Sequence, residues 1–202
     1  MLFRFFDKSA VKYARPATGA RGFTLVEMVI VAAIIVVVTG VLLTNNNTFS
    51  GRILLGNLAY DVALSIREAQ VYGIGTREAE GTFEAAYGVF ISVPDDFGAT
   101  SYTLFADKDG SKSYDAASDL VVQNFTVGNG FRIKDVCYLG AGGYSCEKGT
   151  LNIAFKRPQP DALIYHSSKL DVPLGGAEIV LQSPKGETRI VRVLQSGQIS
   201  VE

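Results

Sequence analysis

The sequence is poor in the residues that most metal sites and many catalytic sites use. It has one histidine, His166, and two cysteines among 202 residues, and only 19% of its residues are charged. One histidine with two cysteines offers too few ligands for an ordinary zinc site. The low charge, together with 48% hydrophobic residues, excludes an intrinsically disordered chain. A net charge of −1 argues against nucleic-acid binding by electrostatic attraction.

The sequence also lacks the motifs of several common enzyme classes. It contains no Gly-x-Ser-x-Gly elbow, no phosphate-binding loop and no His-Glu-x-x-His helix. His166 is followed by Ser167 and Ser168, but three adjacent residues do not make a recognisable catalytic triad by themselves. We therefore expect a protein that is not an enzyme.

One long apolar run is present. Residues 23–43 contain a single ionisable side chain, that of Glu27. As a helix this run is about 31 Å long, at roughly 1.5 Å per residue, which is enough to cross the hydrocarbon core of a bilayer. No other stretch of the sequence is comparable. We expect one membrane-spanning segment.

The distribution of charge predicts which way this segment is inserted. Residues 1–22 are strongly basic, whereas residues 44–63 carry a single basic residue, Arg52. The basic residues of the leader are Arg4, Lys8, Lys12, Arg15 and Arg21. By the positive-inside rule the N-terminus stays in the cytoplasm and residues 44–202 are translocated.

The two cysteines fit an exported domain. Cys137 and Cys146 enclose an eight-residue segment, YLGAGGYS, whose three glycines suit a tight turn. Outside the cytoplasm two such cysteines are expected to form a disulfide. Two free thiols are the alternative.

Two residues are unexpected in a plain signal anchor. The carboxylate of Glu27 is costly inside a membrane unless it is protonated or paired, and Gly22 stands at the boundary between the basic and apolar segments. Residues 22–27, Gly-Phe-Thr-Leu-Val-Glu, resemble the processing motif of type IV prepilins and type II secretion pseudopilins. A plain signal anchor stays open as the alternative.

The resemblance implies a sequence of processing events. A prepilin peptidase would cut between Gly22 and Phe23 and methylate the new amino terminus of Phe23. Glu27 would then pair with the terminal amine of a neighbouring subunit, because two buried charges are tolerated best as a pair. The implied partners are other pilin or pseudopilin subunits and an assembly platform in the inner membrane. The implied locations are that membrane and then the filament.

The segment after the apolar run predicts an amphipathic helix. Its apolar residues recur every three or four positions, at Leu55, Leu58, Val62, Ile66 and Ala69. Glycines 73 and 75 are stop signals. Residues 23–73 are expected to form one helix, although Asn45–Asn47 are poor helix formers and two helices are the alternative.

The rest of the chain predicts antiparallel β structure. Short apolar or alternating runs are separated by turn residues, with no regular alternation of strands and helices. The candidate strands are Tyr87–Val93, Ser101–Ala106, Leu120–Val127, Phe131–Val136, Thr150–Phe155, Ala177–Gln182, Thr188–Leu194 and Gln198–Val201. The expected fold is α+β, with a long helix packed on antiparallel β-sheet. The expected parts are a leader (1–22), a membrane or filament-core helix (23–43), its amphipathic continuation (44–75) and the β domain (76–202).

Two further segments resemble a subgroup of the same family. SIREAQVYGIGTRE at the end of the helix, and TRIVRVLQSGQISVE at the C-terminus, resemble the H-type minor pseudopilins and their type IV pilus counterparts. This resemblance implies a minor structural subunit whose β domain has two antiparallel sheets packed on the long helix. The alternative is an anchored extracytoplasmic binding module, such as a DNA-uptake subunit or a calcium-binding domain.

Each of those modules has candidate residues. Asp107, Asp109 and Asp115 form a weak calcium candidate, but the EF-hand pattern fails and such aspartates often bond local backbone amides in a turn. We therefore expect no cofactor. Lys185, Arg189 and Arg192 are the candidates for contacting DNA, although intervening residues need not leave the two arginines on one face. A nucleic-acid partner is not expected.

Overall fold

The structure is a computed structural model, and it divides the chain into two units. These are Met1–Asn45 and Asn46–Glu202, and each is described by itself. The described residues are 22–75, 78–79, 81, 84–140, 142–169 and 174–202. The basic residues of the predicted leader lie outside them.

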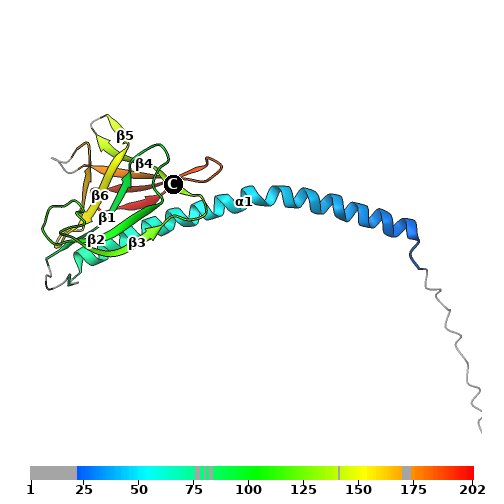
Figure 1. Cartoon of the computed structure of the whole chain (residues 1–202), viewed down its shortest axis with the longest axis horizontal. Coiled ribbons are helices and arrows are strands. Elements are labelled where there is room, and N and C mark those ends of the chain that lie inside the picture. The colour runs from blue at the N-terminus through cyan, green and yellow to red at the C-terminus, as the bar shows by residue number, and fades with distance from the viewer. Residues whose placement is uncertain (1–21, 76–77, 80, 82–83, 141, 170–173) are drawn as a thin grey trace, which may run out of the picture. The chain divides into compact units, whose positions relative to one another are not determined.

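A single helix, α1, runs from Leu25 to Ile74 (Figure 1). Its backbone is helical through residues 45–47, so the three asparagines do not interrupt it. At its C-terminal end the amide of Gly75 donates to the carbonyl of Val71 at 2.9 Å. The glycine stop signals thus fall at the end of the helix, one residue later than predicted.

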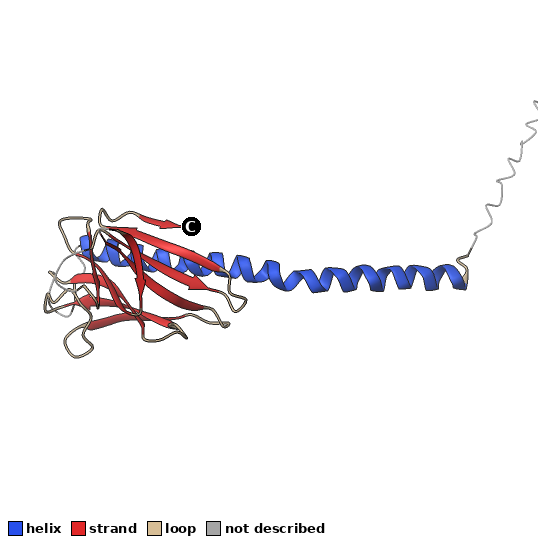
Figure 2. Cartoon of the chain, turned by 90° about the horizontal axis from the view of Figure 1, so that it is seen from above, coloured by secondary structure: helices blue, strands red, loops and turns tan. Residues whose placement is uncertain are grey.

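Two antiparallel five-stranded sheets make up the rest of the described chain (Figure 2). The first has the order β3-β2-β1-β6-β7 and the second β10-β9-β8-β4-β5. The strands are β1 (Ala86–Val93), β2 (Ser101–Asp107), β3 (Leu120–Thr126), β4 (Arg132–Gly140), β5 (Gly143–Glu147), β6 (Gly149–Phe155), β7 (Ala162–His166), β8 (Gly176–Gln182), β9 (Thr188–Leu194) and β10 (Ile199–Val201). The predicted α+β fold with a two-sheet domain is confirmed.

Two of these strands, β5 and β7, were not predicted, and β4 extends to Gly140 where the prediction ended at Val136. Both missed strands are five residues long and lie at the edge of a sheet. The residues of β5 are largely exposed, so this strand has no buried face to produce an alternating pattern. The strand is recognised only from its pairing with β4, which the local sequence pattern does not reveal.

The helix and both sheets share one hydrophobic core. From α1 the fully buried residues are Leu55, Ala59, Val62, Ile66 and Ala69. Four of the five predicted positions are therefore buried, and Ala59 is buried where Leu58 was expected, with Leu58 half-buried beside it. Gln70 adds a polar link, since its side-chain amide donates to the carbonyls of Pro160 (3.2 Å) and Gly197 (3.1 Å). This helix face fixes α1 to the β domain.

Candidate processing and assembly site

The peptide bond between Gly22 and Phe23 lies just before the helix. Neither residue is helical, and the helix begins at Leu25. Both residues are exposed, with 77% of Phe23 accessible. No atom of the described structure comes within 4 Å of a β-carbon built on Gly22. A non-helical, exposed peptide is accessible to a protease.

Thr24 caps the helix. Its hydroxyl oxygen accepts a hydrogen bond from the backbone amide of Glu27 at 3.2 Å, and its carbonyl accepts one from the amide of Met28. This bond satisfies one of the amides that the first turn leaves without a helical partner. The prediction missed this role of Thr24, although a threonine followed three residues later by a glutamate is the sequence pattern of a capping box.

The cap places Glu27 in the first turn of α1. An acidic side chain is favoured there by the partial positive charge at a helix N-terminus. The Glu27 side chain is exposed in the isolated chain, so a partner from another molecule has access to it. The predicted cleavage site thus lies outside the helix, just before Leu25, and Glu27 lies within its first turn.

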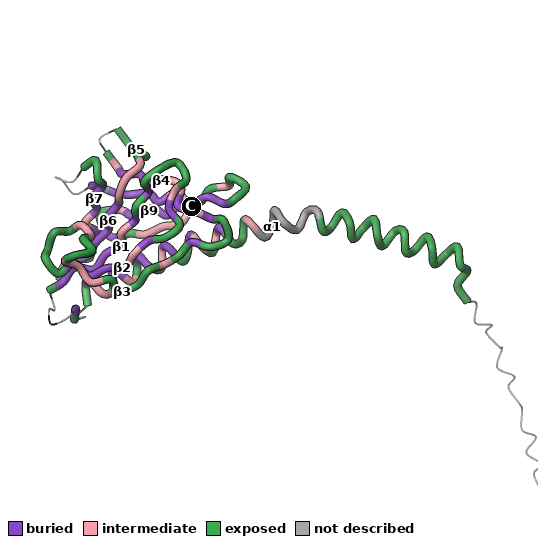
Figure 3. The backbone as a smooth tube through the Cα atoms, viewed as in Figure 1, coloured by how far each residue is buried: buried purple, intermediate pink, exposed green. Residues whose placement is uncertain are grey.

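The apolar segment that follows has the composition of a membrane span. Leu25–Leu43 has a mean hydropathy of 2.9. None of this segment is buried within the subunit, and it is exposed throughout (Figure 3). Such a surface requires lipid or other apolar helices around it. These features are consistent with membrane anchoring.

The predicted disulfide is present. Cys137 of β4 and Cys146 of β5 are bonded and stand directly opposite each other in the strand register. The bond fastens β5, an edge strand, to its neighbour. The disulfide is therefore a structural link within the β domain.

Three aspartates of the β2–β3 loop come together. The carboxylates of Asp107, Asp109 and Asp119 approach within 4.8 Å of one another, so Asp119 takes the place that the sequence assigned to Asp115. Asp107 is 2% exposed and accepts bonds from the amides of Gly110 (2.7 Å), Ser111 (3.2 Å) and Lys112 (2.9 Å). Burial raises the pKa of Asp107. This is the amide-bonding turn that was the alternative to a calcium loop.

The other carboxylates of the loop also accept backbone amides. Asp119 accepts the amides of Lys108 (3.2 Å) and Asp115 (2.8 Å), and Asp115 accepts that of Ala117 (2.9 Å). The amide of Ser111 bonds Asp109 and lowers the pKa of that carboxyl to about 2. Each of these carboxylates thus accepts at least one backbone amide of the loop.

His166 is buried and belongs to a hydrogen-bond network that links the two sheets through the exposed residues Ser168 and Glu147. Its Nδ1 lies 2.7 Å from the hydroxyl of Ser168, which donates to Glu147 at 2.6 Å, and Tyr138 donates to the same carboxylate at 2.9 Å. Burial lowers the pKa of His166, and the bond from Ser168 lowers the pKa of Glu147. Because the carboxylate accepts the Ser168 proton, His166 does not draw that proton as the base of a catalytic triad would.

The three basic residues near the C-terminus are separated. Arg192 is paired with Glu178 at 2.7 Å and with Glu202 at 2.5 Å. Arg189 is exposed, and the alternation of a strand puts it and Arg192 on opposite faces of β9. Lys185 lies in the β8–β9 turn. The arginines therefore do not form one basic strip.

Comparison with known proteins identifies the N-terminal segment. Residues 18–43 match a family model described as the prokaryotic N-terminal methylation motif. This match and the resemblance of residues 22–27 agree, so the N-terminal segment is type IV prepilin-like. Neither the curated proteins nor the solved structures gave a match.

Proposed function

We propose that this chain is the precursor of a minor structural subunit of a type IV pilus or a type II secretion pseudopilus. The observation that carries the proposal is the arrangement of residues 22–27: an uncovered Gly22–Phe23 peptide, a threonine cap and Glu27 in the first turn of an apolar helix. The methylation-motif match over residues 18–43 supports it. Assembly proceeds by packing, so the role is not enzymatic and needs no cofactor.

In this proposal the subunit is first stored in the inner membrane through residues 25–43. Prepilin peptidase removes residues 1–22 and methylates Phe23. The apolar helix then passes from lipid into a filament core, where neighbouring helices replace the lipid around the same surface. Glu27 pairs there with the terminal amine of another subunit, which satisfies both charges.

Mass spectrometry of the protein extracted from membranes tests the processing step. We expect an N-terminal N-methyl-Phe23. Gly22→Val should leave the precursor uncut, because a branched side chain blocks the close approach that glycine permits. Gly19→Val, the same change three residues upstream, is the matched control and should be processed. An intact Met1 terminus in the unaltered chain would reduce it to a plain signal anchor.

Glu27→Gln tests the assembly step separately. The variant keeps the shape and the helix cap but loses the charge, so we expect processed protein that fails to enter filaments. Asp61→Asn removes one carboxylate from the exposed part of the same helix and serves as the control. Normal incorporation of the Glu27→Gln protein would favour the alternative, a membrane-anchored binding module.

The finer assignment to the H-type minor group rests on resemblance. Its support is the SIREAQ segment at the end of α1, the C-terminal segment that forms β9 and β10, and the two-sheet domain on the helix. Whether the filament serves secretion, motility, adhesion or DNA import would follow from which companion subunits co-purify with it.

A further inference from the structure

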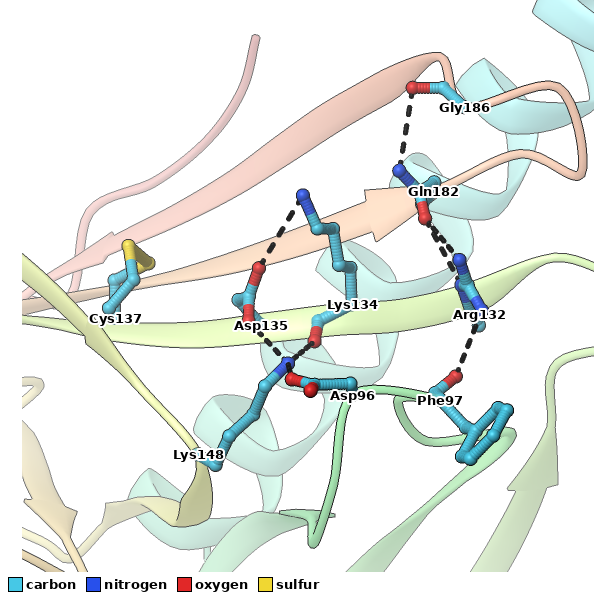
Figure 4. A network of polar contacts seen from close by, with 10 residues as sticks. Asp96, Phe97, Arg132, Lys134, Asp135, Cys137, Lys148, Gln182 and Gly186 are labelled. Carbon is cyan, nitrogen blue, oxygen red and sulfur yellow. Dashed lines mark hydrogen bonds and ion pairs between the residues drawn. A yellow bond between two sulfur atoms is a disulfide. The ribbon is translucent and has the colours of Figure 1, made fainter.

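Three loops meet at one end of the β domain. They are residues 94–100 between β1 and β2, 127–131 between β3 and β4, and 183–187 between β8 and β9, and together we call them the loop end. Arg132 joins two of them, since its guanidinium donates to the carbonyl of Phe97 (3.3 Å) and to the side chain of Gln182 (2.7 Å) (Figure 4). Gln182 in turn donates to the carbonyl of Gly186 at 3.5 Å.

The loop end is fastened to α1 at Arg52. The guanidinium Nε of Arg52 lies 2.7 Å from a carboxylate oxygen of Glu187, although 70% of the Arg52 side chain remains exposed. Beside this pair is an open hollow of about 290 Å³ lined by Arg52, Leu55, Glu187, Thr188 and Arg189. Two guanidinium groups and one carboxylate thus border the hollow, and the net positive charge that remains suits an anionic group.

Arg52, through which the loop end is fastened to α1, is close along the chain to the apolar segment. Arg52 follows Leu43 by about nine residues, or about 14 Å of helix. Gly73, at the other end of the helix face that packs on the domain, is about 30 Å farther on. Whatever the orientation of the two units, this length of chain limits how far the loop end can lie from the end of the apolar segment.

The exposed side chains of the loop end are of the kinds found at lipid surfaces. Lys185 and Arg189 are exposed, and the aromatic ring of Phe97 projects from its loop with 80% of the residue accessible. Basic and aromatic side chains are favoured at the membrane interface. Of the acidic residues there, Glu187 is paired with Arg52, whereas Asp96 is fully exposed and lies 3.8 Å from Lys148.

Asp95 is the remaining acidic side chain of these loops. Its carboxylate accepts the backbone amide of Phe97 at 2.9 Å, which holds the tip of the loop. Lys148 also binds Asp135 at 2.7 Å and the carbonyl of Lys134 at 2.9 Å, so the neighbouring β4 is part of the same polar network. The exposed basic residues of the loop end and its border are Arg52, which is paired with Glu187, Lys185 and Arg189.

We propose that the loop end contacts the anionic lipid headgroups of the membrane in which the apolar helix of the same chain is anchored. Arg52 and Arg189 bind a headgroup phosphate at the hollow, Lys185 adds charge, and Phe97 lies at the interface. The inference rests on membrane storage of the subunit, as proposed above. Such a contact orients the stored domain and must be released when the helix enters a filament.

Because the chain contains no tryptophan, the fluorescence of a single introduced tryptophan tests the contact directly. Phe97→Trp introduces a single fluorophore at an exposed position. The full chain carrying it is reconstituted into phosphatidylcholine vesicles with or without phosphatidylglycerol, using acyl chains brominated near the headgroup. We expect blue-shifted, quenched emission that depends on the anionic lipid. Adding Lys185→Glu and Arg189→Glu should weaken the anionic-lipid dependence by about tenfold or more, and high salt should do the same.

Two variants serve as matched controls at the opposite end of the domain. Ala116→Trp puts the fluorophore in the β2–β3 loop, at the other end of β2 from Phe97, and should not be quenched. Lys156→Glu makes the same charge change beyond the end of β6, which pairs with the start of β1. Combined with Phe97→Trp, it should leave the quenching of the introduced fluorophore unchanged.

Flotation of the vesicles separates the possible failures. If the Phe97→Trp protein floats but its fluorophore is not quenched, or is quenched equally in both kinds of vesicle, the headgroup contact is overturned and the anchor stays intact. Absence of quenching would then favour a neighbouring subunit as the occupant of the loop end. Protein that does not float overturns the anchored state and the headgroup contact together.

Discussion

Gly73 shows how a single position controls the contact between the helix and the first sheet. A β-carbon at this residue would lie 2.2 Å from the carbonyl oxygen of Phe155, which is backbone and cannot rotate away. The carbonyl of Gly73 also accepts the amide of Arg157 at 3.0 Å. The sequence marks Gly73 only as a stop signal, whereas the structure makes it the point where α1 meets the end of β6.

Gly73→Ala should therefore destabilise the protein, by about 1–3 kcal/mol of unfolding free energy. Gly56→Ala is the control on the same helix, because nothing lies within 4 Å of a β-carbon placed there and alanine favours helix. That change should raise stability by about 0.5–1 kcal/mol. Denaturant unfolding of the full chain in detergent distinguishes them, and equal effects of the two changes would contradict a steric role for Gly73.

His166 makes stability depend on pH. Burial lowers its pKa, so the folded state favours the neutral ring and the unfolded chain binds a proton more readily. The stabilising contribution is complete above the ordinary histidine pKa of about 6.5 and is lost as the pH falls through and below that value. The lowered pKa of Glu147 acts in a more acidic range, below the ordinary carboxyl pKa.

We expect the unfolding free energy to decrease between about pH 7 and pH 5.5, and His166→Gln to flatten that slope. His166 is the single histidine, so its imidazole NMR signals report its titration without ambiguity. An unchanged slope in the variant would show that other groups control stability in this range.

At the scale of elements, the sequence predicts the helices and strands that have a regular apolar pattern. It misses the strands that are defined by pairing with a neighbouring strand. The buried face of α1 follows from the spacing of Leu55, Val62, Ile66 and Ala69, and the β8–β9 hairpin follows from two alternating runs around a turn. Edge strand β5 has exposed side chains and is defined by its pairing with β4. The helix cap was readable from Thr24 and Glu27, but the grouping of Asp119 with Asp107 required the return of the chain at β3.

The β2–β3 loop is an element whose main bonds are internal. Asp107→Ala removes the acceptor of three backbone amides, so we expect it to destabilise the metal-free protein by about 2–4 kcal/mol. Asp115→Ala, which removes the acceptor of one exposed amide bond, should have a smaller effect. Melting with a chelator and with added calcium checks both points, and a calcium-dependent rise that Asp107→Ala abolishes would establish a cation site.

At the scale of the whole molecule, apolar surface is distributed in a way that one subunit cannot satisfy. The second half of α1 buries one face in the β domain, yet its opposite face carries Ile53, Tyr60, Leu64 and Val71, which are 48%, 61%, 64% and 60% exposed. These residues follow one another at intervals of seven, four and seven and so form one stripe. The spacing that predicts the buried face does not single out this second stripe. An exposed apolar stripe is expected where a partner covers the surface.

Leu64→Glu should therefore impair assembly without harming the fold. The side chain lies in the middle of the stripe and is largely exposed, so we expect normal processing and an unfolding free energy within about 0.5 kcal/mol of the unaltered chain. Cross-linking between subunits in membranes should fall several-fold, because a charge replaces apolar contact area. Val121→Glu makes the same kind of change at a 40% exposed residue of edge strand β3 and should leave cross-linking unchanged. If both variants cross-link normally, the stripe is not a subunit interface, and assembly relies on the apolar segment and Glu27 alone.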